Sequence, residues 1–143
     1  MKQSMQDSAN ALSIIREAGL RATVARISVL NVLLSAEHAL THNEIEKAVG
    51  VNDGAIERVT LYRVLDWLVN HELAHKITGE DRVWRFNAQS HPMPPHAHFT
   101  CTHCHHVFCL EDLNPAFIGT LPHGFRLTQA DVSLLGICSR CNQ

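Results

Sequence analysis

Four cysteines in two closely spaced pairs are the residues of this sequence with the clearest chemistry. Cys101 and Cys104 form one Cys-X-X-Cys motif, and Cys138 and Cys141 form the other. Two intervening residues let both thiolates of a pair reach one ion from a single tight turn, and two such turns supply the four sulfurs of a tetrahedral shell. A closed four-sulfur shell leaves no position for a substrate, so the quartet predicts a structural zinc site.

Other uses of these thiols are open. Iron can occupy four sulfurs, although zinc is the usual occupant. Two unrelated pairs of free or disulfide-linked cysteines are a second alternative, which a reducing compartment disfavours. Redox catalysis fits less well, because a second motif is present and no thioredoxin-like βαβ pattern surrounds either one.

A second cluster of potential ligands consists of His96, His98 and Cys109. If residues 96–101 are extended, both histidines point to the same side of a strand, and a following hairpin would bring Cys109 close to them. Three ligands leave a zinc shell incomplete, so we expect a fourth from the first half of the chain, where His75 and His38 are the preferred candidates. Such a ligand would tie the two halves together when metal binds, which is how ion binding becomes a switch.

The composition of the chain changes near residue 90. Residues 1–86 hold ten of the twelve Lys and Arg residues and no cysteine, whereas residues 91–143 hold all five cysteines and seven of the eleven histidines. Residues 87–95 are polar and rich in proline, which indicates a hinge linker. We therefore predict two small domains, 1–86 and 96–143.

The first domain is predicted to be helical and to end in a hairpin. The helices are expected over residues 8–18, over residues 23–35, from the capping residue Thr41 to Gly50, and from the capping residue Thr60 onward. Leu73–Thr78 and Arg82–Phe86 are expected as the two strands of the hairpin. This order of elements is typical of a winged helix-turn-helix.

The second domain is predicted to mix strands with one helix. His98–Cys101, Val107–Leu110 and residues 125–137 are expected as strands, and residues 112–120 as a helix. The fold class is therefore α+β, with a winged helix followed by a small α/β domain.

Polar side chains open the helix that starts near Thr60. Thr60, Tyr62 and Arg63 would lie in its first turn, the end that enters the major groove in helix-turn-helix proteins. Arg63 is suited to guanine and Tyr62 to a thymine methyl group or a phosphate, while Arg21 and Arg26 are suited to phosphates or the minor groove. The alternative is that Arg63 pairs with a nearby acid on an ordinary solvated helix.

Charge and hydropathy limit the remaining possibilities. The formal net charge of −2 excludes a strongly basic tail for nucleic acid, but not a local basic face. No apolar run is long enough for a membrane span, and the first residues lack the apolar core of a signal peptide, so we expect a cytoplasmic protein without membrane contact. A zinc hydrolase built on His96, His98 and a water lacks a convincing general base, so we do not expect an enzyme. A zinc-storage protein is a further alternative.

Five segments of the chain match one family in its order. They are Gly19–Arg26, His38–Ile45, Val59–Leu65, His96–Cys104 and Gly136–Cys141. On these motifs the chain resembles the ferric uptake regulator family of bacterial metal-dependent transcription factors, and most closely its zinc uptake branch.

The resemblance implies a fold, partners and site residues. It implies an N-terminal winged helix and a C-terminal dimerisation domain, in a homodimer that binds an inverted-repeat operator and represses metal-homeostasis genes when metal is bound. By position, Tyr62 and Arg63 would read bases and Arg21 would enter the minor groove. The cysteine quartet matches the structural zinc site, and His96 and His98 match the sensing ligands.

Departures from the family pattern bear on the metal. Cys109 stands where many members have a carboxylate, and a thiolate favours zinc over iron(II) and argues against peroxide sensing. His75 aligns with a ligand position of zinc uptake regulators, whereas the family's histidine before the third helix aligns with Ala39, one residue after His38. We therefore expect zinc as the regulatory metal, with an iron-responsive repressor as the alternative.

Two further departures concern metal positions that this chain lacks. Arg85 and Phe86 stand where members often have a carboxylate or cysteine near the end of the wing. Pro95 and Ala97 occupy the positions of an extra metal site, which we expect to be absent.

Overall fold

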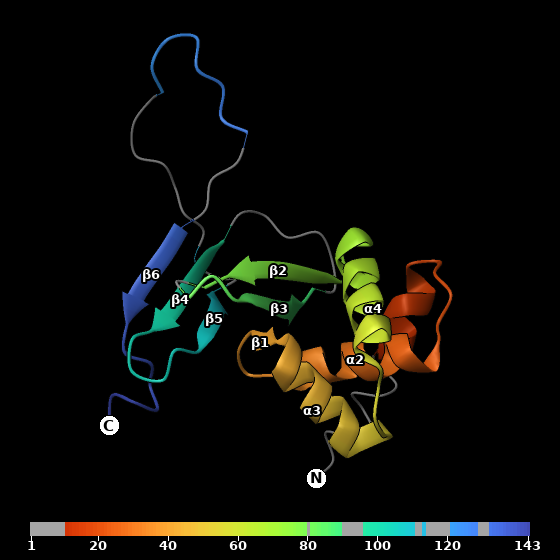
Figure 1. Cartoon of the computed structure of the whole chain (residues 1–143). Helices are drawn as coiled ribbons and strands as arrows, with labels where there is room; N and C mark the ends of the chain where they lie inside the picture. The colour runs from red at the N-terminus through yellow and green to blue at the C-terminus, as the bar shows by residue number, and fades with distance from the viewer. Residues whose placement is uncertain (1–10, 80, 90–95, 111–112, 114–120, 129–131) are drawn as a thin grey trace. The chain divides into compact units, whose positions relative to one another are not determined.

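The chain divides into two units, Met1–Pro92 and Met93–Gln143. The computed structural model describes residues 11–79, 81–89, 96–110, 113, 121–128 and 132–143 of them (Figure 1). The division falls inside the proline-rich segment 87–95. The first two residues of that segment, Asn87 and Ala88, are paired in a strand of the first unit.

Helices make up most of the described part of the first unit. Residues 11–17 are helical, and the later helices are α2 (Val24–Ser35), α3 (His42–Asp53) and α4 (Arg58–Asn70). The predicted capping box opens α3: the Thr41 amide donates to Oε2 of Glu44 at 2.8 Å, and the Glu44 amide donates to Oγ1 of Thr41 at 3.3 Å. Within the described residues, no helix combines the length and apolarity that crossing a membrane would require.

The predicted end of α3 at Gly50 is wrong. The helix continues to Asp53, because Gly50 is tolerated within it and the chain leaves the helix at Gly54 instead. Gly54 has a φ of 89°, in the region that glycine adopts without steric cost.

The predicted start of α4 at Thr60 is also wrong. α4 begins at Arg58, and Glu57 is the residue that precedes it. The first backbone hydrogen bond of the helix is donated by the Leu61 amide to the Glu57 carbonyl at 2.9 Å. Thr60 therefore lies within the first turn, and Tyr62 and Arg63 lie in the second turn rather than the first.

A small antiparallel sheet completes the first unit. Its strands are β1 (Leu40–Thr41), β2 (Ala74–Thr78) and β3 (Trp84–Ala88), in the order β1-β3-β2. The β2–β3 hairpin confirms the predicted wing, with Thr78 opposite Trp84 next to its turn. Its second strand is Trp84–Ala88 and not the predicted Arg82–Phe86. Phe86 of β3 is buried with Leu30 of α2 and Leu65 of α4 in the core between the helices and this sheet (Figure 1).

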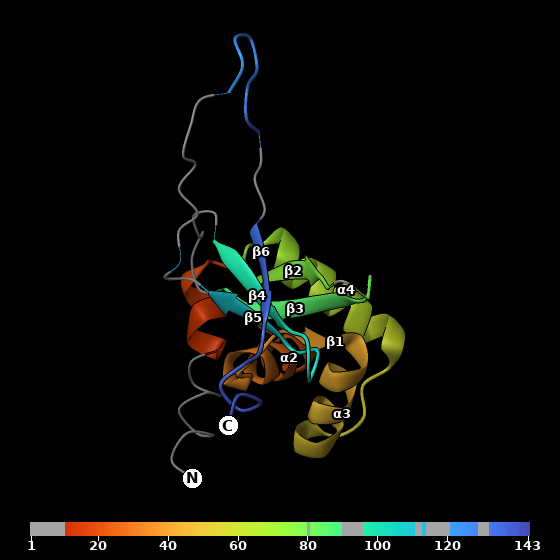
Figure 2. The same ribbon diagram turned by 90° about the vertical axis from the view of Figure 1, so that its left-hand side faces the viewer.

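The second unit is built on another three-stranded sheet. Its strands are β4 (Ala97–Cys101), β5 (Val107–Leu110) and β6 (Val132–Gly136). β4 lies in the centre, antiparallel to β5 and parallel to β6 (Figure 2). The helices and sheets of the two units confirm the α+β class.

Two predictions for the second unit need correction or fall outside the description. Of the strand expected over residues 125–137, the described part that forms a strand is β6. Residues 125–128 are exposed and not in a strand, and the Phe125 amide closes a turn with the Pro122 carbonyl at 3.0 Å. The helix expected over residues 112–120 lies outside the described residues apart from Leu113, which is not helical.

Candidate functional site

The cysteine quartet lies at one end of the second sheet. Cys101 is the last residue of β4, and Cys138 follows β6 by two residues; β4 and β6 run parallel, with Cys101 opposite Gly136, so both motifs leave the sheet at the same end. Each motif is a tight turn, because the His105 amide donates to the Cys101 carbonyl and the Cys141 amide donates to the Cys138 carbonyl. The four Sγ atoms lie within 4.8 Å of one another.

The sulfur spacing fits an ion and not a disulfide. The Sγ atoms of Cys104 and Cys138 are 3.9 Å apart, and all five cysteines are reduced. A disulfide would require a distance of about 2.05 Å. A tetrahedral shell with Zn–S bonds of about 2.3 Å separates its sulfurs by about 3.8 Å. The geometry and the donor set therefore both suit zinc.

Without a cation, the electrostatics of the quartet favour the thiolate form of one cysteine and disfavour the thiolate form of all four at once. The backbone amides of Cys104 and Cys138 donate to Sγ of Cys101, the latter at 3.3 Å, and lower the pKa of Cys101 to about 5. Burial and the three neighbouring thiols raise the pKa of Cys141 to about 12. Thiolates at this spacing repel one another, so a cation is needed to bring all four into the ligand form.

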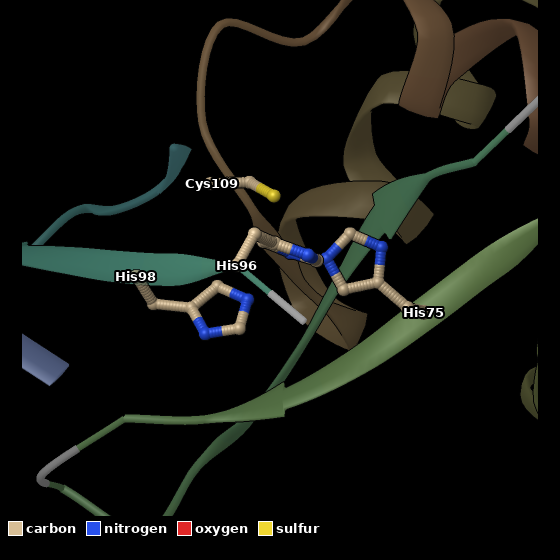
Figure 3. A group of neighbouring side chains, drawn as sticks. All are labelled: His75, His96, His98 and Cys109. Carbon is tan, nitrogen blue, oxygen red and sulfur yellow. The ribbon is translucent and has the colours of Figure 1, made fainter. Parts of the chain in front are cut away.

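Three donors on or next to β4 and β5 form the second cluster. His98 is directly opposite Cys109 in the antiparallel pair, and His96 immediately precedes β4. The imidazole rings of His96 and His98 meet edge to face with centroids 4.8 Å apart. The potential ligand atoms of the three half-buried residues lie within 4.8 Å of one another (Figure 3). The structure thus brings together the three residues that the sequence placed on one side of a hairpin.

The other two predicted ligands belong to the first unit. His75, which Figure 3 also draws, is a half-buried residue of β2 opposite Asn87. His38 precedes β1, and its Nδ1 lies 3.0 Å from the carbonyl oxygen of Ala39. Whether either completes the second cluster stays a prediction.

The predicted DNA-reading residues lie on α4. Leu61, Leu65 and other apolar residues of α4 are buried, while Tyr62 is 43% exposed and Arg63 is exposed. Among the described residues, Arg63 makes no ion pair; Arg58 instead pairs with Glu46 at 3.3 Å. Thr60 is half-buried. The helix therefore offers an aromatic ring and a guanidinium group to a ligand.

Arg21, which precedes α2, and Arg26, in the first turn of α2, differ in their surroundings. Arg21 is exposed, as a phosphate or minor-groove contact requires. The guanidinium of Arg26 lies 3.8 Å from the ring centroid of Trp67, and its Nη1 donates to the Arg21 carbonyl at 2.7 Å. Arg26 therefore holds the backbone at Arg21, a role that its position in the sequence did not reveal.

A winged helix with an exposed Tyr–Arg pair, followed by a sheet with two clusters of potential metal ligands, is the arrangement expected of a metal-dependent DNA-binding regulator. The ferric uptake regulator family matches residues 17–133 of the chain. The ferric uptake regulation protein of Legionella pneumophila is 29% identical over 135 residues, which cover 89% of this chain and 95% of that protein. That of Shigella flexneri is 30% identical over 131 residues, covering 87% and 86%.

The fold comparison agrees with the sequence comparison. A solved structure of a zinc uptake regulator complexed with zinc and DNA has a TM-score of 0.67 and 20% identity, and covers 98% of this chain and 95% of that one. The chain belongs to the ferric uptake regulator family. It is a metal-responsive, DNA-binding transcriptional regulator and not an enzyme.

Proposed function

We propose that this regulator is a zinc-responsive repressor, which acts as a homodimer on an inverted-repeat operator of metal-homeostasis genes. The observation that carries the choice of metal is the sulfur of Cys109 in the second cluster. A set of two imidazoles and one thiolate matches the preferences of zinc, whereas iron(II) regulation is better served by nitrogen and oxygen donors.

The ligand sets follow from the two clusters. Cys101, Cys104, Cys138 and Cys141 would hold the structural zinc, which stabilises the second unit. His96, His98 and Cys109 would bind the regulatory ion, with His75 as the fourth ligand and His38 as the less favoured choice. A fourth ligand from the first unit would let regulatory zinc select one arrangement of the two units.

The iron-responsive repressor remains the alternative, because both curated relatives above carry the name ferric uptake regulation protein. A DNA-binding assay distinguishes a zinc-responsive from an iron-responsive repressor. With the structural site kept filled, half-maximal operator binding should need much less free zinc than free iron(II), measured anaerobically in metal buffers. Equal binding with the second cluster empty would contradict the switch, and a stronger response to iron(II) would favour the alternative.

Contacts with DNA are proposed for four residues. Arg63 and Tyr62 would contact bases in the major groove, with Thr60 beside them and Arg21 at a phosphate or in the minor groove. Arg63→Ala should abolish selective operator binding and leave the metal content unchanged. Loss of metal together with DNA binding would contradict this role, and a wild-type chain that binds zinc but no operator would favour zinc storage.

We propose that the homodimer forms through the second unit. Among the described strands β6 lies at an edge of its sheet, and Leu135 and Ile137 near its end are each 54% exposed. An edge strand with exposed apolar side chains suits a second copy of the same chain. Two recognition helices would then have to lie one DNA turn apart, about 34–36 Å. Sedimentation of the zinc-loaded protein tests this, and a monomer at operator-saturating concentrations would contradict it.

A further inference from the structure

One histidine of the first unit lies between the proposed base-reading tyrosine and the core. His42 is the first residue of α3. Its ring meets that of Tyr62 edge to face, with centroids 4.4 Å apart and an interplanar angle of 78°. It meets the ring of Phe86 in the same way, at 4.9 Å and 74°. The three rings therefore form a continuous chain of ring contacts, from Phe86 on β3 through His42 on α3 to Tyr62 on α4.

The inner end of this chain is fixed. Phe86 is 1% exposed and belongs to the main core. The backbone before His42 is also held, because Thr41 and Glu44 exchange the two hydrogen bonds of the capping box. His42 is thus anchored by its neighbours in the sequence and by a buried ring.

Without the contact with His42, the Tyr62 side chain at the outer end would have more conformational freedom. Tyr62 is 43% exposed, and an exposed aromatic side chain on a helix can occupy more than one rotamer. Fixing such a side chain on binding DNA carries an entropic cost, and a contact that fixes it beforehand removes part of this cost. An edge-to-face partner is suited to this task, because it restricts the ring and leaves the hydroxyl end accessible.

We propose that His42 is a positioning residue, which holds the Tyr62 ring in the orientation that reads the operator. This inference rests on the proposed DNA-binding role of Tyr62 and goes beyond it. The charge state suits the role: burial and the nearby Lys76 lower the pKa of His42, against a smaller opposite effect of Asp66, so the neutral imidazole is favoured.

A first experiment measures the position of the ring without DNA. Tyr62 is the only tyrosine of the chain, so selective labelling of tyrosine rings gives NMR signals from this residue alone in the full-length, zinc-loaded protein. His42→Ala should move the ring signals towards those of an exposed tyrosine, and His42→Phe should retain their dispersion. His71→Ala is the matched control, because His71 packs on Trp67 with centroids 4.6 Å apart. Unchanged ring signals in His42→Ala would overturn the proposal.

A second experiment measures the consequence for DNA. An operator is first selected from random inverted repeats with the wild-type, zinc-loaded protein. His42→Ala should weaken operator binding by about 2- to 12-fold, the range expected for one aromatic pair. The loss should be much smaller in a Tyr62→Ala background, and the dependence of affinity on salt should not change. His42→Phe should restore most of the affinity.

Three other outcomes of the DNA-binding experiment would contradict the positioning role of His42. An equal loss in the Tyr62→Ala background, with a shallower salt dependence, would show that His42 contacts a phosphate directly and would overturn the positioning role. If His42→Ala binds the operator as selectively and as tightly as the wild type, only the positioning role is overturned. If no selective binding is found, the repressor proposal and the positioning role both fail.

Discussion

His98 and Cys109 face each other across the antiparallel pair of β4 and β5. Directly opposed residues in such a pair place their side chains on the same face of the sheet. The hairpin therefore brings an imidazole and a thiol together without help from the loops. The register therefore fixes two donors of the second cluster, and His96, next to the start of β4, lies close to both.

The two kinds of cysteine should respond differently to substitution. Cys138→Ser should destabilise the second unit, because three thiolates bind structural zinc more weakly than four. Cys109→Ser should leave thermal unfolding nearly unchanged, but raise the free zinc needed for half-maximal operator binding by at least about tenfold. Thermal melts, zinc analysis and gel-shift titrations measure these effects. Similar melting curves for the two variants would contradict the division into structural and regulatory thiols.

Local patterns predicted β4, β5 and the proximity of the potential metal ligands in the second unit. His96 and His98 are two residues apart, so an extended backbone is enough to put them on one side. The turns of the Cys-X-X-Cys motifs and the capping box at Thr41 are likewise determined by neighbours in the sequence. Predictions of this kind need no knowledge of the tertiary fold.

Features that depend on packing could not be predicted in this way. Thr60 has the side chain of a capping residue, yet α4 starts at Arg58 and no side chain caps it. The contact of Arg26 with Trp67 joins residues on different helices. So does that of His42 with Tyr62, and no local spacing indicates which ring each would meet.

Gly136 should be required for a stable second sheet. A Cβ atom at this position would lie 2.9 Å from Cζ of the Phe99 ring, on the strand that ends at Cys101. Gly136→Ala should therefore displace the ring and destabilise the unit by about 1–3 kcal/mol, with faster transfer of zinc to a coloured chelator. Phe99→Leu should relieve the clash in a double variant.

The matched control for this prediction is Gly50→Ala. A Cβ at Gly50, within α3, would meet no atom within 4 Å. Alanine is favoured over glycine inside a helix by about 1 kcal/mol, so this variant should be neutral or slightly more stable and should retain zinc. If Gly136→Ala retains zinc as well as Gly50→Ala does, the close approach of Phe99 has no structural consequence.

Arg26 should support DNA binding without touching DNA. Arg26→Gln removes the cation–π contact with Trp67 and the hydrogen bond to the Arg21 carbonyl, so it should cost about 0.5–1 kcal/mol of stability and weaken operator binding. Fluorescence of Trp67 in a Trp84→Phe background should change. Arg58→Gln, which breaks only an exposed ion pair, is the control and should leave that fluorescence unchanged. Equal fluorescence in all three proteins would contradict the contact.

The wing should lose stability in acid through one carboxylate. Arg85 donates to both carboxylate oxygens of Asp81 at 2.8 Å, and these hydrogen bonds hold the pKa of Asp81 well below its ordinary value. A pKa that is lower in the folded state gives stability above about pH 4, the ordinary value for aspartate, and this stability is lost as the pH falls further. Asp81 is about half exposed, so solvent screening keeps the effect modest.

Tryptophan fluorescence isolates this effect, because Trp67 and Trp84 both belong to the first unit. Denaturant titrations between pH 6 and about pH 2 should show a smaller loss of unfolding free energy for Asp81→Asn than for the wild type. Asp53→Asn, at the end of α3, is the control and should follow the wild type. Gly79→Ala should resemble Asp81→Asn, because a Cβ at Gly79 would collide with the Arg85 guanidinium and displace it from Asp81. Parallel pH profiles for all four proteins would show that the pair contributes nothing to the stability of the wing.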